Sequence, residues 1–170
     1  MVGNEVSYES KLLFEVAHRY ACSLRVRLGD ALKAVVLFGS VARGEATPSS
    51  DVDLLVIVEG LPAGRLARYE WVREADEAVE SSLQALREQG IYGDISPILK
   101  TPEEAERTVP LYLDLVEDAC ILYEQDGFFT AILERLRGSL NRLGAQRRRR
   151  GRIRYWDLKP DYTPGEVFEI

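Results

Sequence analysis

Histidine and cysteine are scarce in this 170-residue sequence, which contains one histidine (His18) and two cysteines (Cys22 and Cys120). A zinc site built on these residue types needs more ligands than that, so any metal chemistry has to use carboxylates. The two cysteines lack the spacing of a metal or redox motif. We interpret them as small buried residues of a protein kept in a reducing compartment.

Long apolar runs are also missing. No stretch approaches the roughly 18 apolar residues of a membrane-spanning helix, and the N-terminal residues lack the apolar core of a secretory signal. We therefore expect a cytoplasmic protein that does not cross a membrane. Its length suits one domain, or a domain with an appended subdomain.

Charge is distributed unevenly along the chain. Residues 1–134 contain 12 Lys+Arg and 24 Asp+Glu, whereas residues 135–159 contain 10 Lys+Arg and a single acid, Asp157. An acidic body argues against a general nucleic-acid binder, whose surface is normally basic overall. The sequence thus combines an acidic body with one strongly basic segment.

The most specific signal lies in residues 38–58, which read FGSVARGEATPSSDVDLLVIV. Asp51 and Asp53 open an apolar strand, and residues two apart on a strand point to the same face, about 6–7 Å from each other. Such carboxylates repel one another unless a cation lies between them, and Mg²⁺ binds one or two carboxylates together with substrate phosphates. Gly39 and Ser40 end the preceding apolar run, where backbone N–H groups can meet the same phosphates. The stretch predicts metal-assisted chemistry on a nucleotide.

Further positions are candidates for this site. Arg43, one helical turn after the Gly-Ser pair, can make a charge-assisted contact to phosphate. Two-metal transfer usually needs a third carboxylate, which also accepts the proton of the nucleophile. Asp94 is the preferred candidate, and Glu45 and Glu59 are weaker ones. An ordinary strand-edge aspartate is an equally good interpretation of Asp94.

Hydrophobic periodicity predicts an α/β half followed by a helical half. The expected helices cover residues 8–28, 65–89, 103–108, 110–123 and 127–143, and the expected strands cover residues 34–38, 51–58 and 91–99. A helical turn is expected at residues 40–44, and Thr101-Pro102-Glu103-Glu104 predicts a helix start. We place a core domain at residues 1–100 and a helical C-terminal region, with the basic segment and an extended tail, at residues 101–170.

The motif also resembles a known family. Gly39-Ser40, a gap of ten residues and then Asp51-Val52-Asp53 resemble the signature of the DNA polymerase β-like nucleotidyltransferase superfamily. Residues 39–45 and 50–54 are similar to its small prokaryotic branch, the minimal nucleotidyltransferases, which are related to the kanamycin nucleotidyltransferases. The resemblance implies an α/β (α+β) nucleotidyltransferase fold: a small mixed β-sheet flanked by helices, here with a helical C-terminal extension.

The resemblance further implies Mg²⁺ (or Mn²⁺) and a nucleoside triphosphate. Asp51 and Asp53 would be catalytic metal ligands, Asp94 maps to the third catalytic ligand, and Gly39 and Ser40 would hold phosphate. The expected reaction moves a nucleotide, AMP from ATP, to a hydroxyl group of a partner protein or small molecule and releases pyrophosphate. Many minimal nucleotidyltransferases pair with a HEPN-domain toxin, so an antitoxin-type binding module with weak or no catalysis is the alternative. A transferase directed by RNA or DNA is a third interpretation.

The basic segment, Arg147–Arg150 with Arg152 and Arg154, has three interpretations. It can be a solvated loop or hairpin tip. It can contact nucleic acid or a triphosphate, because Tyr155 and Trp156 follow it and aromatic side chains beside arginines suit stacking. It can also dock onto an acidic protein surface, either this chain's own body or a second copy in a homo-oligomer.

Overall fold

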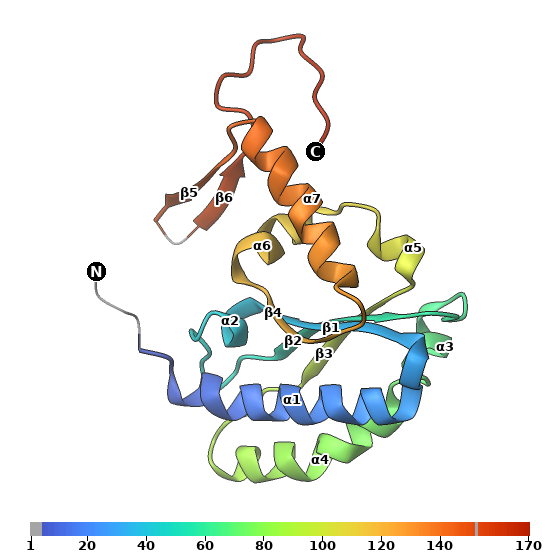
Figure 1. Cartoon of the computed structure of the whole chain (residues 1–170). Coiled ribbons are helices and arrows are strands. Elements are labelled where there is room, and N and C mark those ends of the chain that lie inside the picture. The colour runs from blue at the N-terminus through green and yellow to red at the C-terminus, as the bar shows by residue number, and fades with distance from the viewer. Residues whose placement is uncertain (1–4, 152) are drawn as a thin grey trace.

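The computed structural model describes residues 5–151 and 153–170, and its centre is one four-stranded sheet (Figure 1). The strands are β1 (Leu32–Phe38), β2 (Val52–Val58), β3 (Ile95–Lys100) and β4 (Cys120–Glu124), in the spatial order β3-β2-β1-β4. β1 runs antiparallel to both β2 and β4, whereas β2 and β3 are parallel. The predicted mixed sheet is therefore confirmed.

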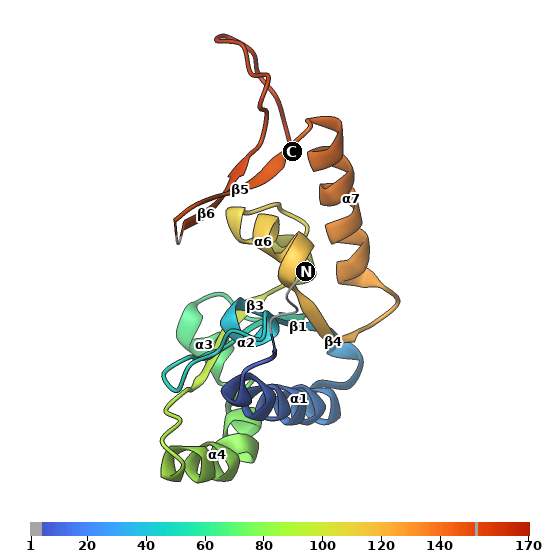
Figure 2. The same cartoon turned by 90° about the vertical axis from the view of Figure 1, so that its left-hand side faces the viewer.

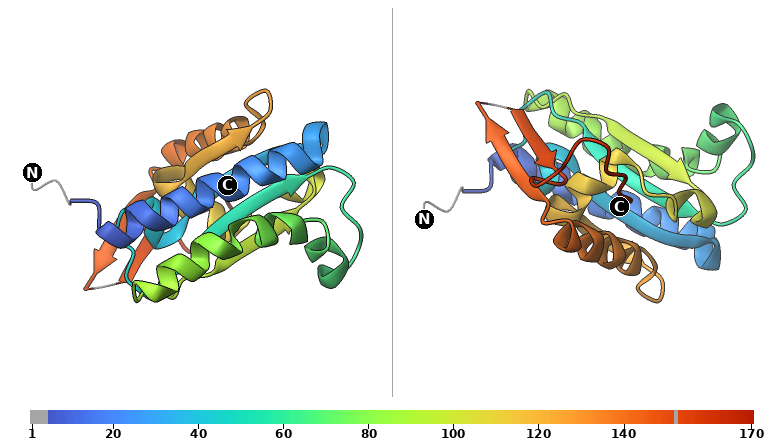
Figure 3. Two further views of the ribbon diagram at one scale, coloured as in Figure 1. Left: turned by 90° about the horizontal axis from the view of Figure 1, so that it is seen from below. Right: turned by 90° about the horizontal axis from the view of Figure 1, so that it is seen from above.

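Helices cover both faces of this sheet (Figure 2). Helices α1 (Tyr8–Leu28) and α4 (Arg73–Glu88) lie across one face, which Figure 3 shows from below. Helices α6 (Pro110–Asp118) and α7 (Phe128–Arg142) lie on the other. Each of the two faces is packed into its own apolar core.

The side chains of β2 alternate between these two cores. Its even-numbered valines and leucine belong to the core beneath α1 and α4: Val52, Leu54, Val56 and Val58. Leu55 and Ile57 belong to the core of α6 and α7, with both side chains fully buried. Asp53 follows the same alternation, so it points toward the α6 and α7 side.

Two expected helices differ from the structure. The single helix expected at residues 65–89 is interrupted, because α3 (Arg65–Tyr69) ends before α4 begins and the intervening Val72 is buried in the core. The helix expected at residues 110–123 ends with α6 at Asp118, and residues Cys120–Glu124, four of them apolar, form β4. Pairing with β1, with Leu37 opposite Cys120, decides the structure of these residues.

The third strand begins later than expected, at Ile95 rather than at residue 91. The residues before it pack against the loop that precedes β2: Tyr92 N–H donates to the Pro48 carbonyl at 2.7 Å. A Cβ on Gly93 would lie only 2.1 Å from the Ser50 carbonyl oxygen. Glycine at this position therefore lets the two loops touch at the start of β2 and β3.

Short helical segments complete the body. The helical turn expected at residues 40–44 is α2, which runs from Gly39 to Ala42 and so begins and ends earlier. A 3₁₀ turn, η1 (Gly29–Ala31), precedes β1. Helix α5 (Pro102–Ala105) begins with the predicted capping box at Thr101, whose side chain accepts from Glu104 N–H while the Glu104 carboxylate accepts from Thr101 N–H. This start turns the chain from β3 toward α6.

The basic segment forms a hairpin of β5 (Gln146–Arg150) and β6 (Ile153–Asp157), separate from the main sheet. The hairpin lies at the same end of the main sheet as α2 (Figures 1 and 3). Arg152, part of the predicted basic segment, lies outside the described residues. The domain boundary at residue 100 stays a prediction, although β4 lies beyond it and completes the sheet.

Both cysteines are free thiols, but their burial differs from expectation. Cys22 is exposed on α1, so its interpretation as a buried residue is wrong, whereas Cys120 is half-buried at the start of β4. Within the described part of the chain, no helix combines the length and apolar character needed to span a bilayer.

Candidate active site

The motif residues meet where β1 ends and β2 begins. Phe38, the last residue of β1, lies opposite Asp53 in the antiparallel register, so Gly39 falls directly beside Asp53. A Cβ on Gly39 would lie 2.3 Å from Asp53 Oδ2, and the φ of Gly39 is +74°. Only glycine combines this backbone conformation with so close an approach. The structure thus places the Gly-Ser turn against the Asp-x-Asp motif.

The two aspartates differ in their surroundings. Asp51 is exposed just before β2, whereas Asp53 is half-buried. Burial raises the pKa of Asp53 above its usual value, repulsion from the Asp51 carboxylate raises it further, and the nearby Arg43 guanidinium lowers it. Neighbouring carboxylates whose charges repel in a partly desolvated position are suited to a hard divalent cation with oxygen ligands.

Asp94 reaches this pair through its backbone. Its N–H donates to Asp51 Oδ1 at 3.0 Å, its own Oδ1 accepts from Ile95 N–H at 2.9 Å, and its carbonyl accepts from Val52 N–H at 2.8 Å. Across residues 5–151 and 153–170, no three Asp, Glu, His or Cys side chains form a group that could hold a metal ion. The role of Asp94 as third ligand therefore stays a prediction.

The two weaker candidates for the third acid, Glu59 and Glu45, form ion pairs with other residues. Glu59 follows the far end of β2 and pairs with Lys33 at 3.0 Å. Glu45 pairs with Arg43 Nε, also at 3.0 Å. The residue that lies opposite Asp53 on β3 is Ser96, so a hydroxyl group occupies the neighbouring register position.

Arg43 belongs to an ionic cluster with Asp118 and Arg147 that the sequence does not predict. Its Nη1 lies 3.9 Å from Oδ2 of Asp118, the last residue of α6. Asp118 also accepts from Arg147 of the hairpin, with 2.8 Å between Arg147 Nη1 and Asp118 Oδ1. No local sequence pattern links these three residues, because pairing of β4 with β1 brings the end of α6 to the end of β1.

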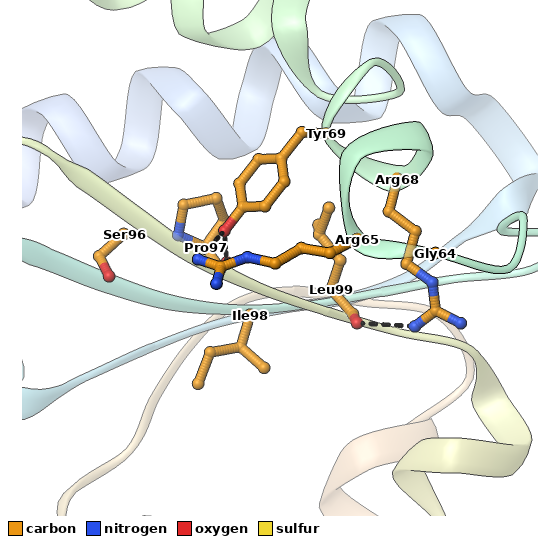
Figure 4. Close-up of a pocket in the computed structure, with 8 residues that line it drawn as sticks. All are labelled: Gly64, Arg65, Arg68, Tyr69, Ser96, Pro97, Ile98 and Leu99. Atoms are coloured by element: carbon orange, nitrogen blue, oxygen red, sulfur yellow. Dashed lines mark hydrogen bonds between the residues drawn. The ribbon is translucent and has the colours of Figure 1, made fainter.

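An open cavity of about 410 Å³ lies beside the outer edge of β3 (Figure 4). Its lining comes from two segments, the start of α3 and the middle of β3: Gly64, Arg65, Arg68, Tyr69, Ser96, Pro97, Ile98 and Leu99. Ser96 belongs both to this cavity and to the register position opposite Asp53. The cavity therefore reaches the β3 position next to Asp53, although its lining includes neither aspartate.

The polar side chains of α3 are fixed to the edge of β3. Arg68 makes two 2.7 Å hydrogen bonds to the Glu104 carboxylate and donates to the Leu99 carbonyl at 3.2 Å. The Tyr69 hydroxyl donates to the Pro97 carbonyl at 3.3 Å. The Arg65 guanidinium lies over the Tyr69 ring, 5.5 Å from its centroid. An aromatic ring and a guanidinium therefore line the α3 side of the cavity.

The fold and this arrangement define a class of enzyme that transfers nucleotides. A family model described as a nucleotidyltransferase domain matches residues 22–123, which include the whole Gly-Ser and Asp-x-Asp motif. The chain therefore belongs to the nucleotidyltransferase family, as the resemblance of the motif predicted.

Two proteins of Methanocaldococcus jannaschii are similar in sequence. The proposed protein adenylyltransferase MJ1305 is 33% identical over 137 residues, which cover 79% of this chain and 88% of that protein. The proposed protein adenylyltransferase MJ0141 is 38% identical over 50 residues, covering 29% of this chain and 50% of that protein.

Two solved structures show more distant similarity. A toxin–antitoxin complex with AMP-PNP aligns with a TM-score of 0.45 at 17% identity, over 75% of this chain and 92% of that chain. A proposed nucleotidyltransferase from Sulfolobus solfataricus aligns with a TM-score of 0.42 at 19% identity, over 74% and 94% of the two chains.

Proposed function

We propose that this protein is a Mg²⁺-dependent adenylyltransferase that moves AMP from ATP to a hydroxyl group of a partner protein and releases pyrophosphate. The observation that carries the proposal is the contact of Gly39 with Asp53 beside Asp51. It brings the turn to which we assign phosphate binding and the two carboxylates to which we assign the metal close to one another. The relative MJ1305, which carries the name of a protein adenylyltransferase, supports a protein as the acceptor.

The residues have distinct roles in this proposal. Asp51 and Asp53 hold Mg²⁺, which would neutralise phosphate charge and orient the reacting groups when bound. Gly39 lets the triphosphate approach the backbone closely, and Ser40 and Arg43 bind its oxygens. Burial of Asp53 and repulsion from Asp51, which both raise the pKa of Asp53, support a metal at this point.

The acceptor hydroxyl has to approach opposite the leaving pyrophosphate, because attacking and leaving oxygens lie roughly in line. Because the proposed phosphate ligands Gly39 and Ser40 lie in α2, pyrophosphate would leave toward that helix. We therefore place the acceptor on the β3 side, at the Ser96 end of the cavity in Figure 4. The hydroxyl oxygen forms a bond to the α-phosphorus, the bond to pyrophosphate breaks, and the hydroxyl proton is lost. Asp94, through its tie to Asp51, is the candidate that remains for the proton acceptor.

A non-catalytic or weakly catalytic antitoxin of a HEPN toxin is the second candidate. The observation that favours it is that no third carboxylate joins the Asp pair among the described residues. A transferase directed by nucleic acid is less well supported, because Arg147 is already bound to the chain's own Asp118.

The test is a transfer assay with radiolabelled ATP and Mg²⁺. The acceptors offered are the protein encoded beside this one, a HEPN-domain protein and hydroxyl-bearing small molecules, and Asp51→Ala/Asp53→Ala is the control. We expect label on a protein with the native enzyme and none with the double variant. If no acceptor is labelled and the double variant still binds its partner, the binding module is the correct function.

A further inference from the structure

Asp118 lies between two arginines from distant parts of the chain. Its side chain is only 15% exposed, and both of its oxygens accept from the guanidinium of Arg147 on β5. Arg43 approaches the same carboxylate from α2 but stops at 3.9 Å, outside hydrogen-bond distance. The carboxylate is thus bound by the hairpin arginine in preference to the arginine of the nucleotide site.

This preference matters because the Arg43 guanidinium and the Asp118 carboxylate are groups that can bind each other through paired hydrogen bonds. A guanidinium and a carboxylate form strong paired hydrogen bonds, and the same donors of the guanidinium bind phosphate. Arg43 already uses its Nε for Glu45, so its Nη groups are the donors that remain for a triphosphate. A carboxylate that captured those groups would compete directly with the nucleotide.

We propose that Arg147 is a positioning residue that occupies Asp118 and thereby keeps Arg43 available to the triphosphate. Docking of the β5–β6 hairpin on α6 and binding of Mg²⁺-ATP are then coupled, although Arg147 itself touches no substrate. The inference rests on the proposed function, because it takes Arg43 as a ligand of the nucleotide. It gives a role to Arg147, a residue of the basic segment that takes no direct part in the transfer reaction.

Simple charge addition predicts a different pattern. If each charge acted on the triphosphate independently, removing Arg147 would weaken binding, removing the charge of Asp118 would strengthen it, and the two effects would add. Competition for Arg43 predicts instead that loss of the Asp118 charge changes the affinity for the triphosphate mainly when Arg147 is absent. The coupling between the two substitutions separates the explanations.

The experiment is a double-mutant cycle with Arg147→Ala, Asp118→Asn and the double variant. Dissociation constants are measured by titration calorimetry with α,β-methylene-ATP and Mg²⁺, so no acceptor is needed. We expect Arg147→Ala to weaken binding about tenfold, as loss of a charged hydrogen bond typically does. Asp118→Asn should change binding about twofold or less, and the double variant should recover to within about threefold of the native protein.

Two further variants distinguish positioning from damage to the fold. Arg148→Ala removes an arginine from the same strand whose partner is Asp157, at 3.1 Å, and should bind like the native protein. Arg147→Lys keeps the charge but loses the paired geometry, so its affinity should fall between those of the native protein and Arg147→Ala. Circular dichroism melting of each variant reports whether the fold is retained.

The outcomes separate this inference from the proposed function. If the native protein does not bind the nucleotide, both fail. If it binds and Arg147→Ala has the same affinity, or the two substitutions simply add, the positioning role is overturned while the proposed function stands. If Arg147→Ala does not fold, an affinity of Arg147→Lys equal to that of the native protein overturns it in the same way.

Discussion

The two ends of β2 present opposite chemistry on a single face of the sheet. At its start, Asp53 is half-buried beside a second carboxylate, and its pKa is raised by that environment. Two and four residues later, Leu55 and Ile57 are fully buried against α6 and α7. The apolar end of the face supplies stability, whereas the charged end costs stability and is the proposed site of the chemistry.

A neighbouring ion pair at the far end shows that charge alone does not make a site. Lys33 Nζ lies 3.0 Å from Glu59 Oε2, but the Glu59 side chain is 64% exposed. Exposed pairs of this kind contribute little to stability. The start of β2 differs because its carboxylates repel each other in a partly desolvated position beside a glycine.

The largest expected effect is on activity at the charged end. Asp53→Ala should reduce nucleotide transfer by at least about 10²–10³-fold, the typical cost of losing one group that stabilises transition-state charge. Its thermal midpoint should be equal to or above that of the native protein, because a repelled carboxylate has been removed. Transfer assays and calorimetric melting measure the two quantities, and a large loss of stability in Asp53→Ala would contradict the comparison.

The apolar end should behave in the opposite way. Leu55→Ala leaves a cavity in the core of α6 and α7 and should lower the free energy of unfolding by about 2–5 kcal/mol. Urea unfolding measures this loss, and Leu55→Met, which keeps the volume, should lose less than about 1.5 kcal/mol. Nucleotide affinity measured well below the melting temperature should be retained, and a selective loss of affinity would show that the two ends are not separate.

A substitution at Gly39 tests the close contact between this residue, which follows β1, and Asp53 of β2. Gly39→Ala should cost about 1–2 kcal/mol of stability from its positive φ and should also weaken binding of the Mg²⁺-nucleotide. Gly90→Ala is the matched control, since Gly90 has φ +84° with no atom within 4 Å of an added Cβ. Equal effects of the two substitutions on nucleotide binding would refute the role of contact with Asp53.

The smallest expected effect concerns pH. Because the pKa of Asp53 is raised from its ordinary 3.8 in the folded state, the folded protein binds more protons than the unfolded chain just above that pH. Asp53 therefore favours the folded protein most at pH values below its pKa in the unfolded chain. This contribution is lost as pH rises through its pKa in the folded protein. Asp53→Asn should lack this loss, so its stability relative to the native protein should increase from pH 3.5 to pH 6.

Melting curves across that range, with and without Mg²⁺, test the prediction. Mg²⁺ should stabilise the native protein near neutral pH and leave Asp53→Asn less affected, because the cation offsets the carboxylate repulsion. A constant difference between the two proteins at all pH values would show that Asp53 does not titrate in the expected direction.

The sequence predicts those parts of the fold that local periodicity determines. Helix α1 has the predicted bounds, and β2 covers all but the first residue of the strand predicted at residues 51–58. The sequence pattern predicts a helix where β4 lies, because this short run has no period of its own, and only pairing with the distant β1 makes it a strand. Long-range pairing is the information that a local pattern does not contain.

The same limit applies to the site. Strand alternation places Asp51 and Asp53 on one face, and a glycine at a strand end predicts a close approach. The contact of Arg43 with Asp118 depends on how α6 packs beside β1, and the contact of Asp118 with Arg147 depends on where the hairpin docks. The hydrogen bond from Asp94 N–H to Asp51 Oδ1 likewise follows from the parallel pairing of β2 and β3.

The outer edge of β3 has a consequence for how this protein meets others. β3 is an edge strand, yet Pro97 has no N–H to offer, and the carbonyls of Pro97 and Leu99 already accept from Tyr69 and Arg68. A strand whose main-chain groups are removed or occupied is a poor template for an added strand. The sheet is thereby protected from edge-to-edge aggregation on this side, and a partner that docks here has to be recognised through its side chains rather than its backbone.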